Sequence, residues 1–169
     1  MKLSDLSESL NSEVDVVNTT VDTTDRYVLY RSKLDTSPPI FVSIRLTNYQ
    51  DLKTIADVCF YSEEQTFGVL NTFGTKGALS IFNTVIKLCE NHINDVDIWF
   101  FSAKFSENAN AKQFQKRTDL YDRLSERLSR KHNHILKRFS IKEDVIWVVS
   151  KEAVSDAEIV DFVNYCSNI

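Results

Sequence analysis

All three glycines of this 169-residue chain fall between Gly68 and Gly77. Glycine makes up about 7% of an average chain and is normally scattered, so this clustering calls for a local cause. The short apolar run Phe67–Leu70 is typical of a strand, and from Ala78 to Ile93 the apolar residues recur at helical spacing. The stretch therefore predicts a strand, a turn over Asn71–Gly77 that uses glycine, and a long amphipathic helix.

A glycine-containing turn before a helix can bind an anion. The first N–H groups of a helix have no partner inside it, and the helix dipole is positive at that end. Lys76 adds a positive charge, and Thr75 could cap the helix or donate its hydroxyl. The alternative is that Gly74 and Gly77 only make a tight turn from strand to helix.

The order of strand, N-T-F-G-T-K-G-A loop and amphipathic helix resembles the core of the GNAT-superfamily N-acetyltransferases, particularly the divergent GNAT-like proteins of tailed phages. In that family an R/Q-x-x-G-x-G/A loop binds the pyrophosphate of acetyl coenzyme A through its backbone N–H groups. Asn71 stands at the R/Q position, Gly74 at the first glycine, and Lys76 where a second glycine or alanine belongs. The resemblance implies acetyl-CoA as cofactor, bound by Leu70, Asn71, Gly74, Thr75, Lys76, Gly77 and Ala78.

Composition narrows the class of protein. The length fits one domain, and the 43% hydrophobic and 26% charged residues are ordinary for a soluble globular chain. No apolar run is long enough to cross a bilayer, and the N-terminus lacks the pattern of a secretory leader. A cytoplasmic protein is the expectation, in the host cytoplasm or the virion if the gene is a phage gene.

The cysteines and histidines do not form a recognisable metal or catalytic motif. Cys59, Cys89 and Cys166 are an odd number at wide spacing. Cys59 and Cys89 fall within apolar patterns, which is typical of buried thiols in a reducing compartment, and a catalytic thiol is the alternative. The histidine pair His132 and His134 lacks zinc-ligand spacing. We therefore expect no metal site.

The N-terminal residues 1–25 carry six acids against one lysine. Leu3, Leu6 and Leu10 could form one face of a short helix, and the remainder is polar. This segment is interpreted as an acidic arm that is either a docking tail for a protein partner or a solvated terminus.

The remaining residues 26–169 predict a single α/β domain. Residues 49–56 are interpreted as a turn or short helix, and Asn133 and Ser155 as a helix stop and a helix cap. The expected order of elements is several strands, a helix, a strand, a helix, two strands and a helix. This order indicates a mixed, mostly antiparallel sheet of six to seven strands flanked by helices, and it is GNAT-like. The GNAT sheet parts between its fourth and fifth strands, which here would be Phe67–Leu70 and Asp97–Ala103. Further expected strands are Tyr27–Arg31, Ile40–Leu46, Val58–Tyr61, Ile135–Ile141 and Val145–Ser150, and a helix is expected over Ala111–Lys131.

Two kinds of catalytic residue are candidates. The stretch L-Y-D-R-L resembles the family's second motif, which implies that Tyr121 protonates the leaving thiolate; the alternative is an ordinary core tyrosine. Acyl transfer to an amine also needs a base. Glu63 and Glu64 could take that proton, or they could be solvated turn residues.

The helix after the fifth strand is rich in cations. Lys112, Lys116 and Arg117 could neutralise the 3′-phosphate of coenzyme A or contact a nucleic-acid backbone. Nucleic acid is disfavoured by the sequence pI of 5.4 and by the lack of aromatic residues interleaved with these charges. A salt-bridged face, with pairs such as Asp119–Arg123 and Asp122–Arg127, is the other interpretation.

The sequence thus predicts a divergent acetyl-CoA-dependent N-acetyltransferase that acts on an unknown amine of a small molecule or a protein. The alternative is a catalytically inactive GNAT-fold phage protein that serves as a virion-associated or protein-interaction module. No membrane association is expected, and the oligomeric state stays open.

Overall fold

The computed structural model of the chain describes residues 12–49, 53–62, 74–105 and 110–167. These residues form a seven-stranded sheet and three helices, so the predicted α/β class with a mostly antiparallel sheet is confirmed. The strands are β1 (Val16–Thr23), β2 (Tyr27–Leu34), β3 (Ile40–Tyr49), β4 (Lys53–Ser62), β5 (Ile98–Ala103), β6 (Ile135–Ile141) and β7 (Asp144–Ser150). The helices are α2 (Gly74–Glu90), α3 (Ala111–His132) and α4 (Asp156–Ser167).

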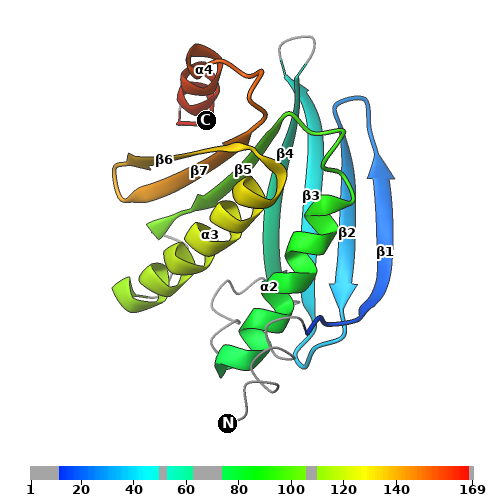
Figure 1. Cartoon of the computed structure of the whole chain (residues 1–169). Helices are drawn as coiled ribbons and strands as arrows, with labels where there is room; N and C mark the ends of the chain where they lie inside the picture. Colours follow the sequence, from blue (N-terminus) through cyan, green and yellow to red (C-terminus); the bar gives the residue numbers. More distant parts are fainter. Residues whose placement is uncertain (1–11, 50–52, 63–73, 106–109, 168–169) are drawn as a thin grey trace.

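The strands lie in the order β1-β2-β3-β4-β5-β7-β6. Every neighbouring pair is antiparallel except β4 and β5, which are parallel and are connected through α2. Figure 1 shows the two halves of the sheet, β1 to β4 and β5 to β7, meeting at this parallel pair. The sheet therefore changes its pairing pattern once, at its centre.

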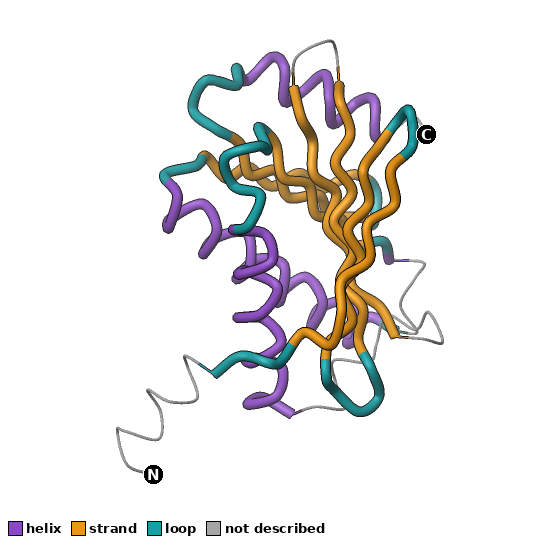
Figure 2. Tube along the Cα trace, turned by 90° about the vertical axis from the view of Figure 1, so that its right-hand side faces the viewer, coloured by secondary structure: helices purple, strands orange, loops and turns teal. Residues whose placement is uncertain are grey.

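Two apolar layers cover the two faces of the sheet. Helices α2 and α3 pack on one face, where the larger core includes Val85, Leu128 and Trp147. Helix α4 packs on the other face through a smaller core that contains Ile159 and Phe162. Figure 2 shows α2 and α3 together on one side of the strands.

Local sequence signals explain where several elements begin and end. Ser155 caps α4 as predicted, because its Oγ accepts a hydrogen bond from the N–H of Glu158, whose Oε2 accepts one from the N–H of Ser155. Asn133 stops α3 with a φ of 54°, a left-handed conformation that asparagine tolerates. Strand β6 has the predicted bounds. None of the described helices is both long and apolar enough to span a membrane.

The expectation of an acidic arm over residues 1–25 is wrong for its second half. Val16–Thr23 forms β1, which pairs with β2 along its length. Before it, the N–H of Val14 donates to Thr84 Oγ1 at 2.8 Å, which ties the segment to α2. Strand β1 forms although all eight residues are exposed, since backbone pairing with β2 does not require an apolar face. Residues 1–11, including Leu3, Leu6 and Leu10, lie outside the described part.

The prediction between the third strand and the first long helix also needs correction. The expected strand Val58–Tyr61 is part of a longer strand, β4, which begins at Lys53 where a turn or short helix was expected. Tyr49 ends β3, and residues 50–52 lie outside the described part. Strand β4 lies beside β5, and Phe67–Leu70, the expected neighbour of that strand, lies outside the described residues. Gly74–Gly77 form the first turn of α2 and not a turn before it. The cost of glycine in a helix, about 1 kcal/mol each, is offset because α2 buries a long apolar face.

Candidate active site between strands β4 and β5

The parallel pairing of β4 and β5 lasts for only three residue pairs, from Ile55↔Ile98 to Asp57↔Phe100. Beyond this point β4 continues to pair with β3 as far as Ser62, and β5 continues to pair with β7 as far as Ala103. The two strands therefore part toward their carboxyl ends, as the ribbon shows (Figure 1). In open sheets with parallel strands, ligands bind outside such ends.

Aromatic side chains fill the space where the strands part. Tyr121, on α3, is 1% exposed, and its ring centroid lies 5.3 Å from Phe60 of β4 and 5.9 Å from Phe101 of β5. Trp147 of β7 lies 5.4 Å from the same ring. The predicted catalytic tyrosine thus lies between the separating strands, and it is also a core residue.

The Tyr121 phenol holds its proton strongly. Its pKa is raised to about 12, chiefly by burial; Arg117, which is hydrogen-bonded to it, opposes the rise, and the nearby Cys59 and Asp57 add to it. The Arg117 guanidinium lies 5.7 Å from the rings of both Tyr121 and Phe60. At neutral pH the site therefore contains a protonated phenol beside a guanidinium.

Asp57 is a candidate that sequence reasoning missed. It occupies the last β4 position that pairs with β5, and its Oδ2 lies 3.0 Å from Arg45 Nη2. Burial raises the pKa of this carboxyl, and the charges of Arg45 and Lys104 oppose that rise. An acid in the interior of a mostly apolar strand was the available signal, but only the pairing with β5 shows its significance. Glu63 and Glu64, the predicted bases, lie outside the described residues.

The first turn of α2 lies after β4 in sequence. Gly74, Thr75 and Lys76 supply N–H groups that have no acceptor within the helix, and the turn contains no acidic residue. Figure 1 shows this end of α2 on the side of the sheet toward which β4 and β5 part. Leu70 and Asn71, the other predicted cofactor contacts, lie outside the described residues, as do the side chains of Thr75 and Lys76.

A small apolar pocket lies between α2, α3 and β4. It contains about 210 Å³ of empty space, including the part open to solvent. Its position next to Phe60 joins it to the aromatic cluster around Tyr121. Ala78, predicted as a cofactor contact, faces this pocket. The lining residues are Phe60, Ala78, Ile81, Phe82, Val85, Leu120 and Leu124.

The cationic helix α3 differs from the predictions in two ways. Arg117 is buried instead of solvated, whereas Lys112 and Lys116 are exposed. Asp122 does not pair with Arg127. It accepts a hydrogen bond from Trp147, and Arg127 donates to Asn83 Oδ1 at 2.6 Å.

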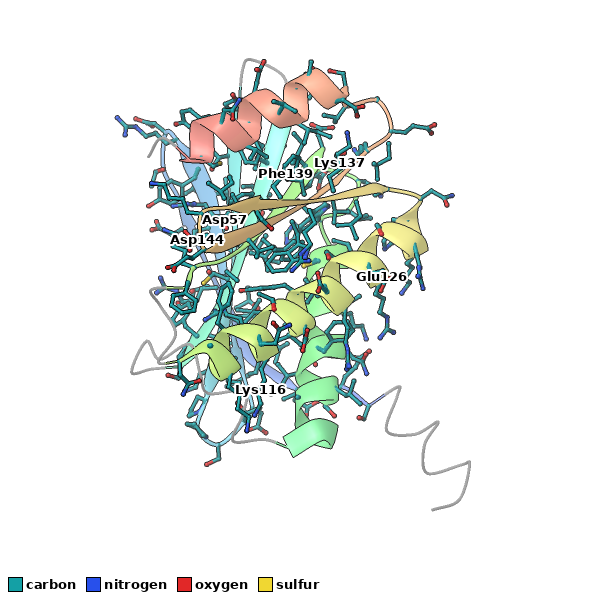
Figure 3. The ribbon with its side chains drawn as sticks, turned by 90° about the vertical axis from the view of Figure 1, so that its left-hand side faces the viewer. Asp57, Lys116, Glu126, Lys137, Phe139 and Asp144 are labelled. Carbon is teal, nitrogen blue, oxygen red and sulfur yellow. The ribbon has the colours of Figure 1, made fainter. Side chains whose placement is uncertain are left out.

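The expected pair of Asp119 with Arg123 is not among the ion pairs of the described residues, and Asp119 accepts a hydrogen bond from Gln115. The salt-bridged interpretation holds in part, since Arg130 pairs with Glu126 at 2.7 Å. Figure 3 shows Lys116 and Glu126 along α3, apart from Asp57.

In comparisons with protein-family models, with curated proteins and with solved structures, nothing matches this chain. The function has to be argued from the geometry described above.

Proposed function

We propose that this protein is a divergent acetyl-CoA-dependent N-acetyltransferase of the GNAT type. The observation that carries the proposal is the parallel pair β4 and β5, which parts after three residue pairs around the buried Tyr121. A strand order with one central parallel pair, joined by a helix that begins at a glycine, agrees with the resemblance in the sequence. Fold alone does not determine function, so the proposal depends on these residues.

The first turn of α2 fits the diphosphate of the cofactor. The N–H groups of Gly74, Thr75 and Lys76 can donate to phosphate oxygens, and Gly74 has no Cβ to keep a ligand away from the backbone. The absence of an acid in this turn avoids repulsion. Acetyl-CoA supplies an acetyl group activated as a thioester.

Two residues where the strands part, on opposite faces of the sheet, support this chemistry. Tyr121 is protonated at Oη at neutral pH and can donate that proton to a leaving thiolate, although its pKa of about 12 makes it a weaker acid than an exposed phenol. The raised pKa of Asp57 makes its carboxylate a better proton acceptor than an ordinary aspartate, which suits the removal of a proton from the acceptor amine. Arg45 holds that carboxylate in place.

Ligand-induced stabilisation tests the proposal. Acetyl-CoA at about 100 times its Kd should stabilise the protein by about 2.7 kcal/mol, which corresponds to a rise in Tm of roughly 5–11 °C for a domain of this size. Gly74→Arg should abolish the rise by blocking the first turn of α2. The matched control is Ala111→Arg, which places the same side chain in the first turn of α3 and should keep the rise. No shift at millimolar acetyl-CoA would contradict the proposal.

A second candidate is a GNAT-fold interaction module without catalysis. It is favoured by the close aromatic packing of Tyr121 with Phe60, Phe101 and Trp147, which fills the space where substrate would enter. The acetyltransferase would release free coenzyme A during turnover, and the interaction module would not. An assay for free coenzyme A with a panel of amines should detect turnover for the enzyme and none for the module.

A partner that binds through the acidic N-terminal residues would support the module. Deletion of residues 1–25 would remove β1 and damage the sheet, so a deletion of residues 1–11 is the appropriate variant. Its effect on co-purification of a partner distinguishes a docking tail from a solvated terminus.

A further inference from the structure

The face of β2, β3 and β4 opposite α2 and α3 carries two rows of side chains that the proposed function does not use. Because side chains alternate along a strand, residues next to the buried Leu34, Val42 and Phe60 point away from the larger core. Helix α4 lies on this face too, where it packs against β5, β7 and the hairpin end of β3 and β4 at Tyr49 and Ile55, and no described helix packs on these two rows (Figures 1 and 2). The strand register places Asn18, Lys33, Phe41 and Tyr61 in the first row, and Thr20, Arg31, Ser43 and Cys59 in the second.

Aromatic rings and cations are neighbours in this surface, which we call the strand platform. The rings of Phe41 and Tyr61 are 5.7 Å apart with an interplanar angle of 17°. Lys33 lies beside Phe41 across β2 and β3, and Arg31 lies in the adjacent row. Phe41 and Tyr61 are half-buried and neither belongs to an apolar core of the described chain, so each ring keeps part of its surface open to solvent.

The two rows of the strand platform hold two cations, Arg31 and Lys33, and no acid. Among the ion pairs of the described residues, none involves Arg31 or Lys33. In the next row Asp57 is paired with Arg45, and Asp22 of β1 stands opposite Leu29, diagonal to Arg31, in none of the ion pairs of the described residues. The site is therefore complementary to an anion that also offers flat apolar rings.

We propose that the strand platform binds single-stranded nucleic acid. Bases stack on aromatic side chains displayed by a sheet, while cations beside them follow the phosphates, and this combination does not require a particular base sequence. An acidic peptide would satisfy Arg31 and Lys33 but would leave the paired rings of Phe41 and Tyr61 without a role. The sequence disfavoured nucleic acid for two reasons, the pI of 5.4 and the lack of interleaved aromatic residues on α3. The register of distant strands produces that interleaving elsewhere, while the overall acidity of the chain remains.

Fluorescence anisotropy with a labelled thymidine oligonucleotide of about 12 nucleotides tests the proposal at about 50 mM salt. Phe41→Ala and Tyr61→Ala should each weaken binding about tenfold. Arg31→Gln should weaken binding and reduce the slope of log K against log salt by about 0.7, the value for one phosphate of a single strand. Unfolding measurements on each variant would exclude loss of the fold.

Two controls match these variants. Lys116→Gln removes an exposed cation from α3, on the opposite side of the sheet, and Tyr165→Ala removes an aromatic ring that is 56% exposed on α4. Neither should change affinity more than about twofold. The strand platform is distinct from the first turn of α2, so Gly74→Arg should leave oligonucleotide binding intact even if it abolishes stabilisation by acetyl-CoA.

Three results would each overturn the proposal. The first is no anisotropy change at protein concentrations of about 100 μM, the weak limit of non-specific binding. The second is equal weakening by Lys116→Gln and Arg31→Gln, which would place the oligonucleotide elsewhere. The third is binding that survives Phe41→Ala unchanged and is matched by an oligoglutamate peptide, which would show a generic anion surface.

Discussion

The indole Nε1 of Trp147 donates a hydrogen bond to Oδ1 of Asp122 at 2.6 Å, and this bond joins strand β7 to helix α3. Trp147 is fully buried, and Arg138 lies 5.6 Å from its ring and 3.5 Å from the same carboxylate oxygen. Asp122 follows Tyr121 directly in the chain. The bond therefore fixes the part of α3 that places the phenol between β4 and β5.

Asp122→Ala should destabilise the protein because it leaves the buried Trp147 N–H without an acceptor. The expected loss in the free energy of unfolding is about 1–3 kcal/mol, measured by urea unfolding with tryptophan fluorescence. Asp119→Ala is the matched control, since Asp119 is exposed and accepts a bond only from Gln115 among the described contacts. A loss of equal size in both variants would contradict the structural role of the indole bond.

The raised pKa of Tyr121 predicts a specific pH dependence of stability. An acid whose pKa is higher in the folded state than in the unfolded state makes unfolding easier as pH rises through the interval between the two values. For a phenol whose pKa is raised by burial from its ordinary value of 10.0 to about 12, the free energy of unfolding should fall by about 1 kcal/mol between roughly pH 9 and pH 11.

Tyr121→Phe should remove this part of the pH dependence while keeping most of the ring contacts. Urea unfolding at the two pH values measures it as the difference between the wild type and the variant. Leu124→Ala is a control that removes buried apolar atoms from the same helix and no titrating group, so its cost should be equal at both values. An unchanged slope in Tyr121→Phe would mean that the phenol is not buried in solution.

The turn between β6 and β7 contains a residue in an unfavourable backbone conformation. Lys142 has a φ of 57°, and it is the first of the two residues between the paired Ile141 and Asp144. A two-residue hairpin with positive φ at this position prefers glycine. Lys142→Gly should raise the free energy of unfolding by about 1 kcal/mol, whereas Glu143→Gly should lower it or leave it unchanged. Thermal unfolding of both variants measures these two changes in stability. A loss of stability in Lys142→Gly would show that the contacts of the lysine side chain contribute more to stability than relief of its positive φ.

Much of the fold follows from local sequence signals. The hairpin of β6 and β7, the long helix α3 and the Ser155 cap were predictable because each depends on residues that are close in the chain. Strand β1 was missed because Val16–Thr23 is mostly polar and is held by backbone pairing with β2 and by hydroxyl contacts such as Thr19 with Ser32, and not by an apolar face. The polar and acidic composition of residues 1–25 therefore led to the prediction of an acidic arm.

The candidate site was predictable only in part. Tyr121 could be found because it lies on the apolar stripe of α3 and matches a motif. The parting of β4 from β5 depends on strand register between residues that are more than forty positions apart, as in Asp57↔Phe100. The pairing of Asp57 with Arg45 depends on the register of β3 and β4, across twelve positions. No local pattern determines such a register, because it results from the packing of both cores.

The last prediction concerns the base in the proposed acyl transfer. Asp57→Asn should lower the rate of acetylation by about 10²–10⁴-fold, the usual contribution of a general base, because asparagine cannot accept the proton of the amine. Stabilisation by acetyl-CoA should persist, since Asp57 is not part of the first turn of α2. Asp161→Asn, an exposed change on α4, is the matched control and should keep the wild-type rate. Coenzyme A release and thermal shifts on the same samples separate catalysis from binding.

A wild-type rate in Asp57→Asn would assign the base to another residue. Loss of the thermal shift would mean that the carboxylate of Asp57 supports cofactor binding instead.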